Sequence, residues 1–360
     1  MSGQLAAIKA VLGKFPMSAW LIDADETIVY MNREMQDLFG DLSGRKTDLV
    51  YGGAAAARAD MEKAGFAEVA LADVPFRLIG NDVELDGEGR YRIELFEDIS
   101  EKKHMQDSLV LNLAKVKAET TVAKSIQHSI LPVDDTYWNT IAFSSVYLPA
   151  DDLGGDFFDI LRINEDEFLL YMADVSGHGI QASLLTIFMQ GRVRANADTA
   201  SEGIDILLGK LLKDFCALEI SGMIYLTMIL CKYNRKRKEL SIANAGHNCF
   251  PLIMRQSGHS ETIPIKGMPI CTISDEDSYE EEIVSMNPGD RLILYTDGII
   301  EEVDPVRKRA FGQEGVREIA EKCQDYSGAY LARAIIEASS KYTLLTAKDD
   351  RTILVADILA

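Results

Sequence analysis

Four motifs built around aspartate hold the residues of this sequence that could do chemistry. Each motif lies where an apolar, strand-like segment begins or ends, and each has glycine or threonine neighbours. Glycine permits sharp turns and lets backbone groups approach a ligand. Because carboxylates brought together repel each other unless a cation compensates, the motifs together predict a cation-binding site. The four are Gly154-Gly155-Asp156, Asp174-Val175-Ser176-Gly177-His178-Gly179, Thr296-Asp297-Gly298 and Lys348-Asp349-Asp350-Arg351-Thr352.

The types of these side chains favour hard divalent cations. Carboxylate oxygens without a cysteine cluster suit Mg²⁺ or Mn²⁺. Two such ions can activate water and neutralise charge on a phosphoryl group. A single Asp-Gly step at a strand end more often marks only a turn, so the prediction depends on the four motifs acting together. Ser176 lacks the flanking pattern of a nucleophilic serine.

The cysteines and the apolar segments limit where the protein works. The five cysteines are scattered and include no Cys-x-x-Cys pair, which predicts neither a disulfide framework nor a thiolate metal site. A reducing cytoplasm is therefore expected. No apolar run reaches the ~18 residues of a membrane helix, and the N-terminal segment lacks the features of a signal peptide. The cysteines are Cys216, Cys231, Cys249, Cys271 and Cys323.

The charge balance argues against two classes of partner. The sequence has 57 acidic and 37 basic residues, a formal net charge of -20. Such a surface repels nucleic acid and anionic membranes, so binding to either is not expected. The basic run Arg235-Lys236-Arg237-Lys238 could attract an acidic partner, or it could be the solvated tip of a hairpin.

Strands alternating with pairs of helices must position the aspartates. Apolar and β-branched runs predict strands at residues 140–147, 157–163, 167–174, 223–233, 239–244, 280–285, 291–295 and 352–358. Helical periodicity predicts helices at residues 179–195, 203–219, 313–323 and 328–344. Antiparallel strands with helices inserted in pairs favour two stacked sheets flanked by helices. Residues 133–360 are therefore expected to form one α+β domain.

A separate α+β module is expected over residues 1–98. Two strands, then helices, then three strands are predicted, with the first helix at residues 33–39 ended by Gly40. The strands are expected at residues 19–22, 27–30, 66–71, 75–84 and 91–97. Residues 99–131 contain neither glycine nor proline, which predicts one long helix that Pro132 terminates. This helix, over residues 99–132, would link the two domains.

The predicted linker helix shows an imperfect heptad pattern. Apolar residues recur every seven positions, but two of the companion positions hold Asn112 and Glu119. The pattern predicts a homodimer through a coiled coil, and the alternative is a single helix packed on its own domain. The recurring residues are Leu109, Val116, Ala123 and Ile130.

In their order and with their flanking strands, the motifs resemble the metal-dependent type-2C protein phosphatase superfamily, in particular its bacterial branch that regulates sporulation and stress sigma factors. The resemblance covers essentially residues 124–360. It includes the segment Lys124-Ser125-Ile126-Gln127-His128-Ser129-Ile130-Leu131-Pro132 and the segment Asn244-Ala245-Gly246-His247-Asn248. It implies an α/β-β/α sandwich that binds two Mn²⁺ or Mg²⁺ ions at one end.

The resemblance also implies roles for the metal ligands. Asp174 is similar to the carboxylate that bridges both ions, and the backbone carbonyl of Val175 would complete the coordination of the second ion. Asp297 and Asp349 are similar to ligands of the first ion. Asp156 is similar to the acid that holds metal-bound water or, in some cases, a metal.

The sequence leaves the roles of three further residues open. Asp350 adjoins Asp349, and the sequence does not separate their roles. His178 could support the site or donate a proton, and a structural role at a helix start is at least as plausible. His247 could orient a loop near the site, but a structural role is favoured.

The implied reaction is direct attack of metal-activated water on a phosphoserine or phosphothreonine. The implied substrate is a phosphorylated anti-sigma-factor antagonist or a similar regulator. One alternative is a catalytically inactive phosphatase-like module that captures a regulatory partner. Another is a domain that makes or destroys a small signalling molecule, but the sequence offers no nucleotide-binding loop for it.

Residues 1–98 resemble a PAS sensor domain. The resemblance rests on Phe15-Pro16-Met17-Ser18-Ala19-Trp20-Leu21-Ile22-Asp23, on Met31-Asn32-Arg33, and on Glu97-Asp98-Ile99-Ser100-Glu101. It implies that a signal received by this domain controls the phosphatase through the helix.

Overall fold

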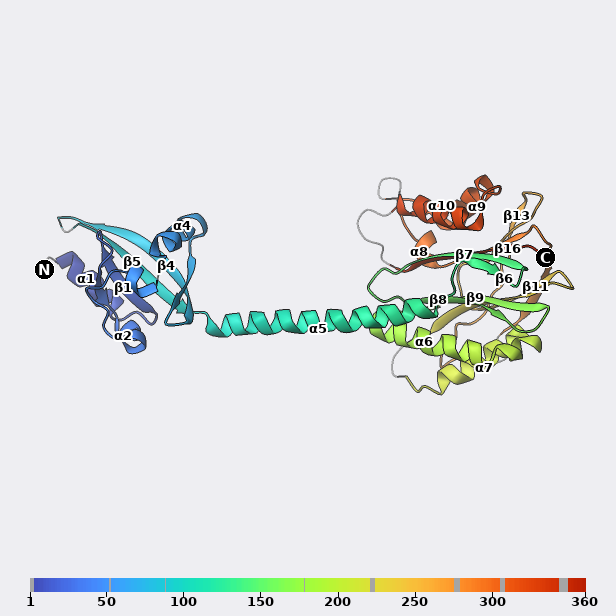
Figure 1. Cartoon of the computed structure of the whole chain (residues 1–360), viewed down its shortest axis with the longest axis horizontal. Helices are drawn as coiled ribbons and strands as arrows, with labels where there is room; N and C mark the ends of the chain where they lie inside the picture. Colours follow the sequence, from blue (N-terminus) through green and yellow to red (C-terminus); the bar gives the residue numbers. More distant parts are fainter. Residues whose placement is uncertain are drawn as a thin grey trace. The chain divides into compact units, whose positions relative to one another are not determined.

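The computed structural model describes residues 3–51, 53–87, 89–177, 179–220, 224–274, 279–304, 308–342 and 349–360. The chain divides into two units, Met1–Val116 and Lys117–Ala360 (Figure 1). The boundary falls inside the long helix α5 (Ser100–Ile130), which begins and ends close to the predicted limits. His178, Lys348, the start of the strand predicted at 223 and the end of the helix predicted at 344 lie outside the described residues.

One antiparallel sheet forms the centre of the N-terminal unit. Its strand order is β2-β1-β5-β4-β3. The strands are β1 (Ser18–Asp23), β2 (Ile28–Met31), β3 (Ala67–Leu71), β4 (Val74–Leu85) and β5 (Gly89–Asp98). The helices are α1 (Gly3–Leu12), α2 (Arg33–Phe39), α3 (Asp48–Tyr51) and α4 (Ala54–Ala64). The predicted sequence of two strands, helices and three strands is confirmed, including the bounds of α2.

Strand β1 is buried on both faces because helices cover each side of this sheet. Trp20 and Ile22 belong to the apolar cluster beneath α2, α3 and α4, whereas Ala19 and Leu21 belong to the cluster with α1. Alternate residues of a strand point to opposite faces. Because both faces are covered here, every position from Ala19 to Ile22 is apolar. The Trp20 indole donates a hydrogen bond of 2.7 Å to the buried carboxylate of Glu94 on β5. Burial raises the pKa of Glu94.

Two stacked antiparallel sheets form the centre of the C-terminal unit (Figure 1). The first has the order β14-β11-β10-β9-β8, and the second has the order β13-β12-β15-β16-β7-β6. The first sheet contains β8 (Asp156–Arg162), β9 (Glu167–Val175), β10 (Leu226–Asn234), β11 (Glu239–Ala245) and β14 (Glu281–Ser285). The second contains β6 (Asp135–Tyr137), β7 (Ile141–Leu148), β12 (Leu252–Met254), β13 (Ser260–Thr262), β15 (Arg291–Tyr295) and β16 (Arg351–Ile358).

Helices cover the outer face of each sheet, so the unit has four layers. The pair α6 (Ile180–Ala195) and α7 (Ile204–Cys216), joined by a 3-10 turn at Ala197–Ser201, packs on the first sheet. The pair α9 (Gly312–Lys322) and α10 (Gly328–Ser340) packs on the second. A short helix, α8 (Asp297–Ile300), follows β15. This arrangement confirms the predicted sandwich of two sheets flanked by helices.

The central strand β9 shows how the layers are held together. Phe168, Leu170 and Met172 pack into the core between the two sheets. Leu169 and Tyr171 face the opposite way, into the core beneath α6 and α7. Burial on both faces makes β9 a rigid support for the residues at its end.

Most predicted elements of this unit are confirmed, but several short elements were not predicted. They are the helix α8, the 3-10 turn at Ala197–Ser201 and the three-residue strands β6, β12 and β13. Strands this short are defined by their pairing partners and leave little periodic signal in the sequence. The helix predicted to end at residue 219 ends at Cys216. Among the described residues, no helix has the length and apolar character needed to cross a membrane.

Candidate metal site

Asp156 and Asp174 face each other at the end of the first sheet. Asp156 is the first residue of β8, and its partner across the antiparallel ladder is Asp174 on β9. Val175 ends β9, and its N–H donates to the carbonyl of Gly155. The strand pairing therefore places two of the predicted site residues side by side.

Three oxygen atoms surround the Cα of Gly155. A Cβ added there would lie 2.7 Å from the carbonyl oxygen of Val175, 3.2 Å from that of Gly177 and 3.3 Å from Oδ1 of Asp174. Only glycine leaves this small space open. Carboxylate and carbonyl oxygens are the donors that hard divalent cations prefer, so this group of oxygens fits the predicted ion type.

Threonines from the second sheet hold Asp156. The hydroxyl of Thr296 donates to Oδ2 of Asp156 at 2.9 Å, and the hydroxyl of Thr352 also donates to this oxygen. The N–H of Thr352 in turn donates to the Thr296 hydroxyl at 3.0 Å. Asp156 is therefore fixed to the ends of β15 and β16, which ties the two sheets together at the site.

The neighbours Asp349 and Asp350 have different surroundings. Asp350 is buried and accepts backbone N–H bonds from Ala150 at 2.8 Å, Gly155 at 2.6 Å and Asp156 at 3.3 Å. Asp349 is exposed, and its carboxylate accepts the N–H of Asp350 at 2.8 Å. Both oxygens of Asp350 are thus engaged in holding the loop before β8, and Asp349 keeps the freer carboxylate.

Asp297 lies where β15 passes into α8. It is half-buried, and its Oδ2 accepts a bond of 3.3 Å from the side-chain amide of Asn248. The next residue, Gly298, lies against the carbonyl of Asp350 so closely that a Cβ would collide with it. This glycine therefore lets the turn that carries Asp297 approach the segment that carries Asp349.

The pKa values show that these carboxylates affect each other. Burial, followed by the charges of Asp297, Asp349 and Asp350, raises the pKa of Asp174 to about 8. Burial, followed by the charges of Asp174 and Asp350, raises the pKa of Asp156 well above its usual range. Partial desolvation and the charge of Asp297 raise the pKa of Asp349. The protein therefore holds at one end of the sandwich a set of acids that resists full ionisation.

No group of three or more His, Cys, Asp or Glu side chains in the described part of the chain is placed so that it could hold a metal ion as it stands. Two observations consequently support ion binding at this site: the carboxylate and backbone oxygens around Gly155, and the raised pKa values of the neighbouring aspartates.

The end of helix α5 contacts the loop before Asp156. Gln127 is buried, and its side-chain amide donates to the carbonyl of Gly154 at 2.8 Å. The carbonyl of Ile130, at the end of α5, accepts bonds from Gln190 and Arg194 of α6. The last turn of α5 is therefore joined to both the site loop and α6.

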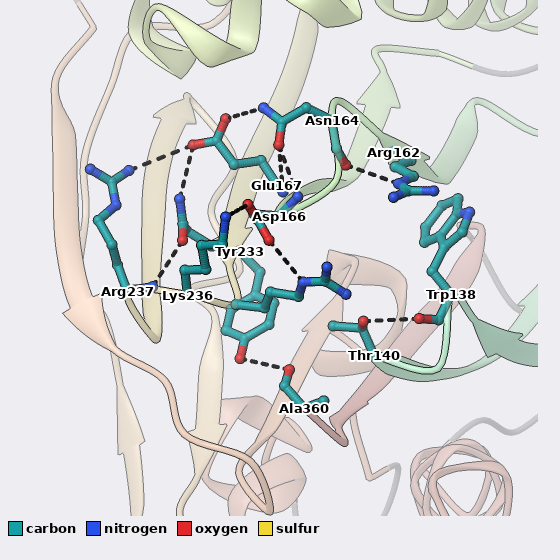
Figure 2. A network of polar contacts seen from close by, with 12 residues as sticks. Trp138, Thr140, Arg162, Asn164, Asp166, Glu167, Tyr233, Lys236, Arg237 and Ala360 are labelled. Carbon is teal, nitrogen blue, oxygen red and sulfur yellow. Dashed lines mark hydrogen bonds and ion pairs between the residues drawn. The ribbon is translucent and has the colours of Figure 1, made fainter.

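The basic run lies away from the site. Figure 2 shows that Asp166 and Glu167, at the start of β9, face Lys236 and Arg237 of the β10–β11 hairpin. Asp166 also pairs with Arg235 at 3.0 Å. Seven residues of extended chain, roughly 23 Å, separate Glu167 from Asp174. Neighbouring acidic residues of the same chain thus pair with this basic run, which favours its interpretation as the tip of a hairpin over a docking site for an acidic partner.

Sequence reasoning missed several residues that hold the site. Thr296 and Thr352 stand inside two of the recognised motifs, but their bonds to Asp156 were not predicted. Gln127 and Asn248 also lie in segments quoted for the resemblance. The hydroxyl of Ser176 accepts the N–H of Tyr225 at 2.9 Å, a contact that the sequence did not predict.

Comparison with known structures identifies the class of fold. The SiaA PP2C domain of Pseudomonas aeruginosa superposes with a TM-score of 0.58 and 19% identity, over 68% of this chain and 97% of that domain. The chain therefore contains the PP2C fold of type-2C phosphatases. A family model described as Stage II sporulation protein E (SpoIIE) matches residues 164–359. The chain belongs to this family.

Two curated relatives from Bacillus subtilis (strain 168) are named phosphoserine phosphatases. RsbU is 21% identical over 187 residues, which are 52% of this chain and 55% of RsbU. RsbP is 24% identical over 188 residues, which are 51% of this chain and 46% of RsbP. The chain thus spans about half the length of the curated relatives it matches.

Asp174→Asn should stabilise the protein when metal is absent. The pKa of Asp174 is raised in the folded state from 3.8 to about 8, so its stabilising contribution is complete below pH 4 and is lost as the pH rises through about 8. In EDTA at pH 8, we expect the variant to melt several degrees higher than the wild type, since each ~1 kcal/mol shifts the melting temperature of a domain of this size by about 2–4 °C. Thermal melts from pH 4 to 9 measure this, and an equal pH dependence in both proteins would contradict it.

Proposed function

We propose that the C-terminal unit is a metal-dependent phosphatase that removes phosphate from phosphoserine or phosphothreonine in a protein. The observation that carries the proposal is the set of carboxylate and carbonyl oxygens around Gly155, with Asp174 held there at a raised pKa. Membership of the SpoIIE family and the names of the two relatives support it.

In this proposal Asp174 and the carbonyl of Val175 would hold one of two Mn²⁺ or Mg²⁺ ions, and Asp174, Asp297 and Asp349 would hold the other. Two such ions supply, when bound, an activated water and neutralise charge on the phosphoryl group. Asp156 would lie beside these ligands, held in place by the two threonine hydroxyls that donate to its Oδ2.

Asp350 has a supporting role in this proposal. Its two oxygens accept three backbone N–H groups, which leaves little capacity for an ion. It instead holds the loop of Gly154 and Gly155, whose lack of side chains keeps the oxygen-lined space open. Asp349 is therefore the better candidate for the metal ligand.

The proposed substrate is a phosphorylated anti-sigma-factor antagonist or a similar small regulator. The support is the family and the resemblance to RsbU and RsbP. An inactive module that only captures such a regulator is the alternative. The raised pKa values argue against it, because a cluster of buried carboxylates destabilises a protein that has no cation to bind.

Gly155→Ala should abolish metal-dependent hydrolysis. The new methyl group would occupy the oxygen-lined space, 2.7 Å from the Val175 carbonyl, and displacement of ligands by about 1 Å can reduce turnover about 100-fold. Hydrolysis of p-nitrophenyl phosphate and of phosphorylated candidate regulators, with Mn²⁺ and with EDTA, is the measurement. Gly191→Ala is the control, since nothing lies within 4 Å of the added Cβ in α6. Equal turnover with Mn²⁺ and with EDTA in the wild type would overturn the proposal.

We also propose that the N-terminal unit, over residues 1–98, is a PAS-like sensor that acts through the linker at 99–132. Its strand order and the helices between β2 and β3 support this. Apolar side chains along α5 are exposed in the single chain, which supports a homodimer through this helix. They include Met105, Leu109, Leu113, Val116, Val122 and Ile126.

Gln127 offers a path from the helix to the site. It is the buried side chain of α5, and it bonds the backbone of Gly154, two residues before Asp156. A rotation or register change of α5 would move this amide and with it the loop. Polar Asn112 and Glu119 weaken the seam, so two arrangements can lie within a few kcal/mol of each other.

Replacing both Asn112 and Glu119 with Leu should fix one arrangement of the proposed dimer. Basal turnover should change several-fold, and the response to an N-terminal signal should diminish. Light scattering gives the oligomeric state, and phosphatase assays give the turnover. A monomer whose turnover is indifferent to the double substitution would rule out regulation through the seam.

A further inference from the structure

His247 forms a hydrogen-bonded bridge between the two sheets. It is buried, in the turn after β11, and its Nε2 lies 3.0 Å from the carbonyl oxygen of Tyr295. Its Nδ1 lies 3.3 Å from the hydroxyl of Thr227. A carbonyl can only accept, so Nε2 carries the proton, and Nδ1 accepts from Thr227. Burial lowers the pKa of His247, which favours this neutral form.

The two ends of this bridge lie beside the proposed metal ligands. Thr227 on β10 is the ladder partner of Asp174, and its hydroxyl also lies 3.4 Å from the Asp174 carbonyl oxygen. Tyr295 ends β15 and is two residues before Asp297. The imidazole therefore links the strand end that carries Asp174 in one sheet to the strand end that carries Asp297 in the other.

Asn244 fixes the position of the imidazole. The N–H of His247 donates to Oδ1 of Asn244 at 2.7 Å, and the Asn244 amide donates to the carbonyl oxygens of His247 at 2.9 Å and Ile265 at 2.8 Å. Gly246, with a φ of 73°, allows the tight turn between them, and a Cβ there would meet Pro269. These bonds and the close approach of Pro269 hold the turn against the sheets.

We propose that His247 is a positioning residue that holds the ends of β9 and β15 at the separation that one ion requires. Asp174 and Asp297 are like charges carried at the ends of the two sheets, so they repel each other, and the bridge opposes their separation. The inference rests on the proposed function, because it concerns the same ion-binding ends. It assigns His247 no contact with substrate or ion.

Mn²⁺ titration of the full chain, followed by electron paramagnetic resonance, tests this inference without a phosphatase assay. His247→Leu removes both bonds and should weaken Mn²⁺ binding at least about tenfold, as loss of groups that orient metal ligands does. Thr227→Val removes the bond to Nδ1 and keeps the shape, so it should weaken binding by less. His247→Gln can still donate to Tyr295 and should recover part of the affinity.

Tyr233→Phe is the matched control. Tyr233 is buried at the far end of β10, and its hydroxyl donates to the carbonyl of Ala360 at 3.1 Å, so the variant loses a comparable bond away from the site. Its Mn²⁺ affinity should equal that of the wild type. If His247→Leu does not fold, Thr227→Val and His247→Gln decide. Equal Mn²⁺ affinity in the wild type and the bridge variants overturns the inference alone, whereas no binding by the wild type overturns the proposed function as well.

Discussion

Repulsion among the carboxylates at one end of the C-terminal sandwich is the constraint on which the rest of this structure depends. Burial and neighbouring charges raise the pKa values of Asp156 and Asp174, and partial desolvation with the charge of Asp297 raises the pKa of the exposed Asp349. Such a group is stable when protons or cations compensate it. The fold keeps the acids together because Asp156 and Asp174 lie on paired strands of one sheet and Asp349 lies just before a strand of the other.

The same constraint explains the polar contacts around the acids. The carboxylate of Asp350 accepts backbone N–H groups, and that of Asp156 accepts threonine hydroxyls from the other sheet. Gly155 and Gly298 have no side chain, which lets oxygen atoms approach the backbone closely at these positions. Each of these features either fixes a carboxylate or leaves space beside one. The arrangement fits a site prepared for ions, whereas a site meant only for stability would use apolar packing.

Local signals in the sequence predicted much of this. The strands β8, β9, β15 and β16 and the aspartates at their ends follow from apolar runs flanked by Asp and Gly. Contacts between distant residues could not be predicted in this way. The three backbone bonds that engage Asp350 come from Ala150, Gly155 and Asp156, about 200 residues earlier in the chain. The sequence therefore could not show which of Asp349 and Asp350 keeps a free carboxylate. The threonine bonds to Asp156 span 140 and 196 residues, and Glu94 pairs with Trp20 across 74.

Isothermal titration with Mn²⁺ at pH 7, in buffers of different ionisation enthalpy, tests the central claim most directly, because it counts ions and released protons together. The pKa of about 8 for Asp174 means that this acid is largely protonated at pH 7 before an ion binds. We therefore expect two ions to bind per chain, with release of protons to the buffer. Binding without proton release, or no binding, would contradict the account.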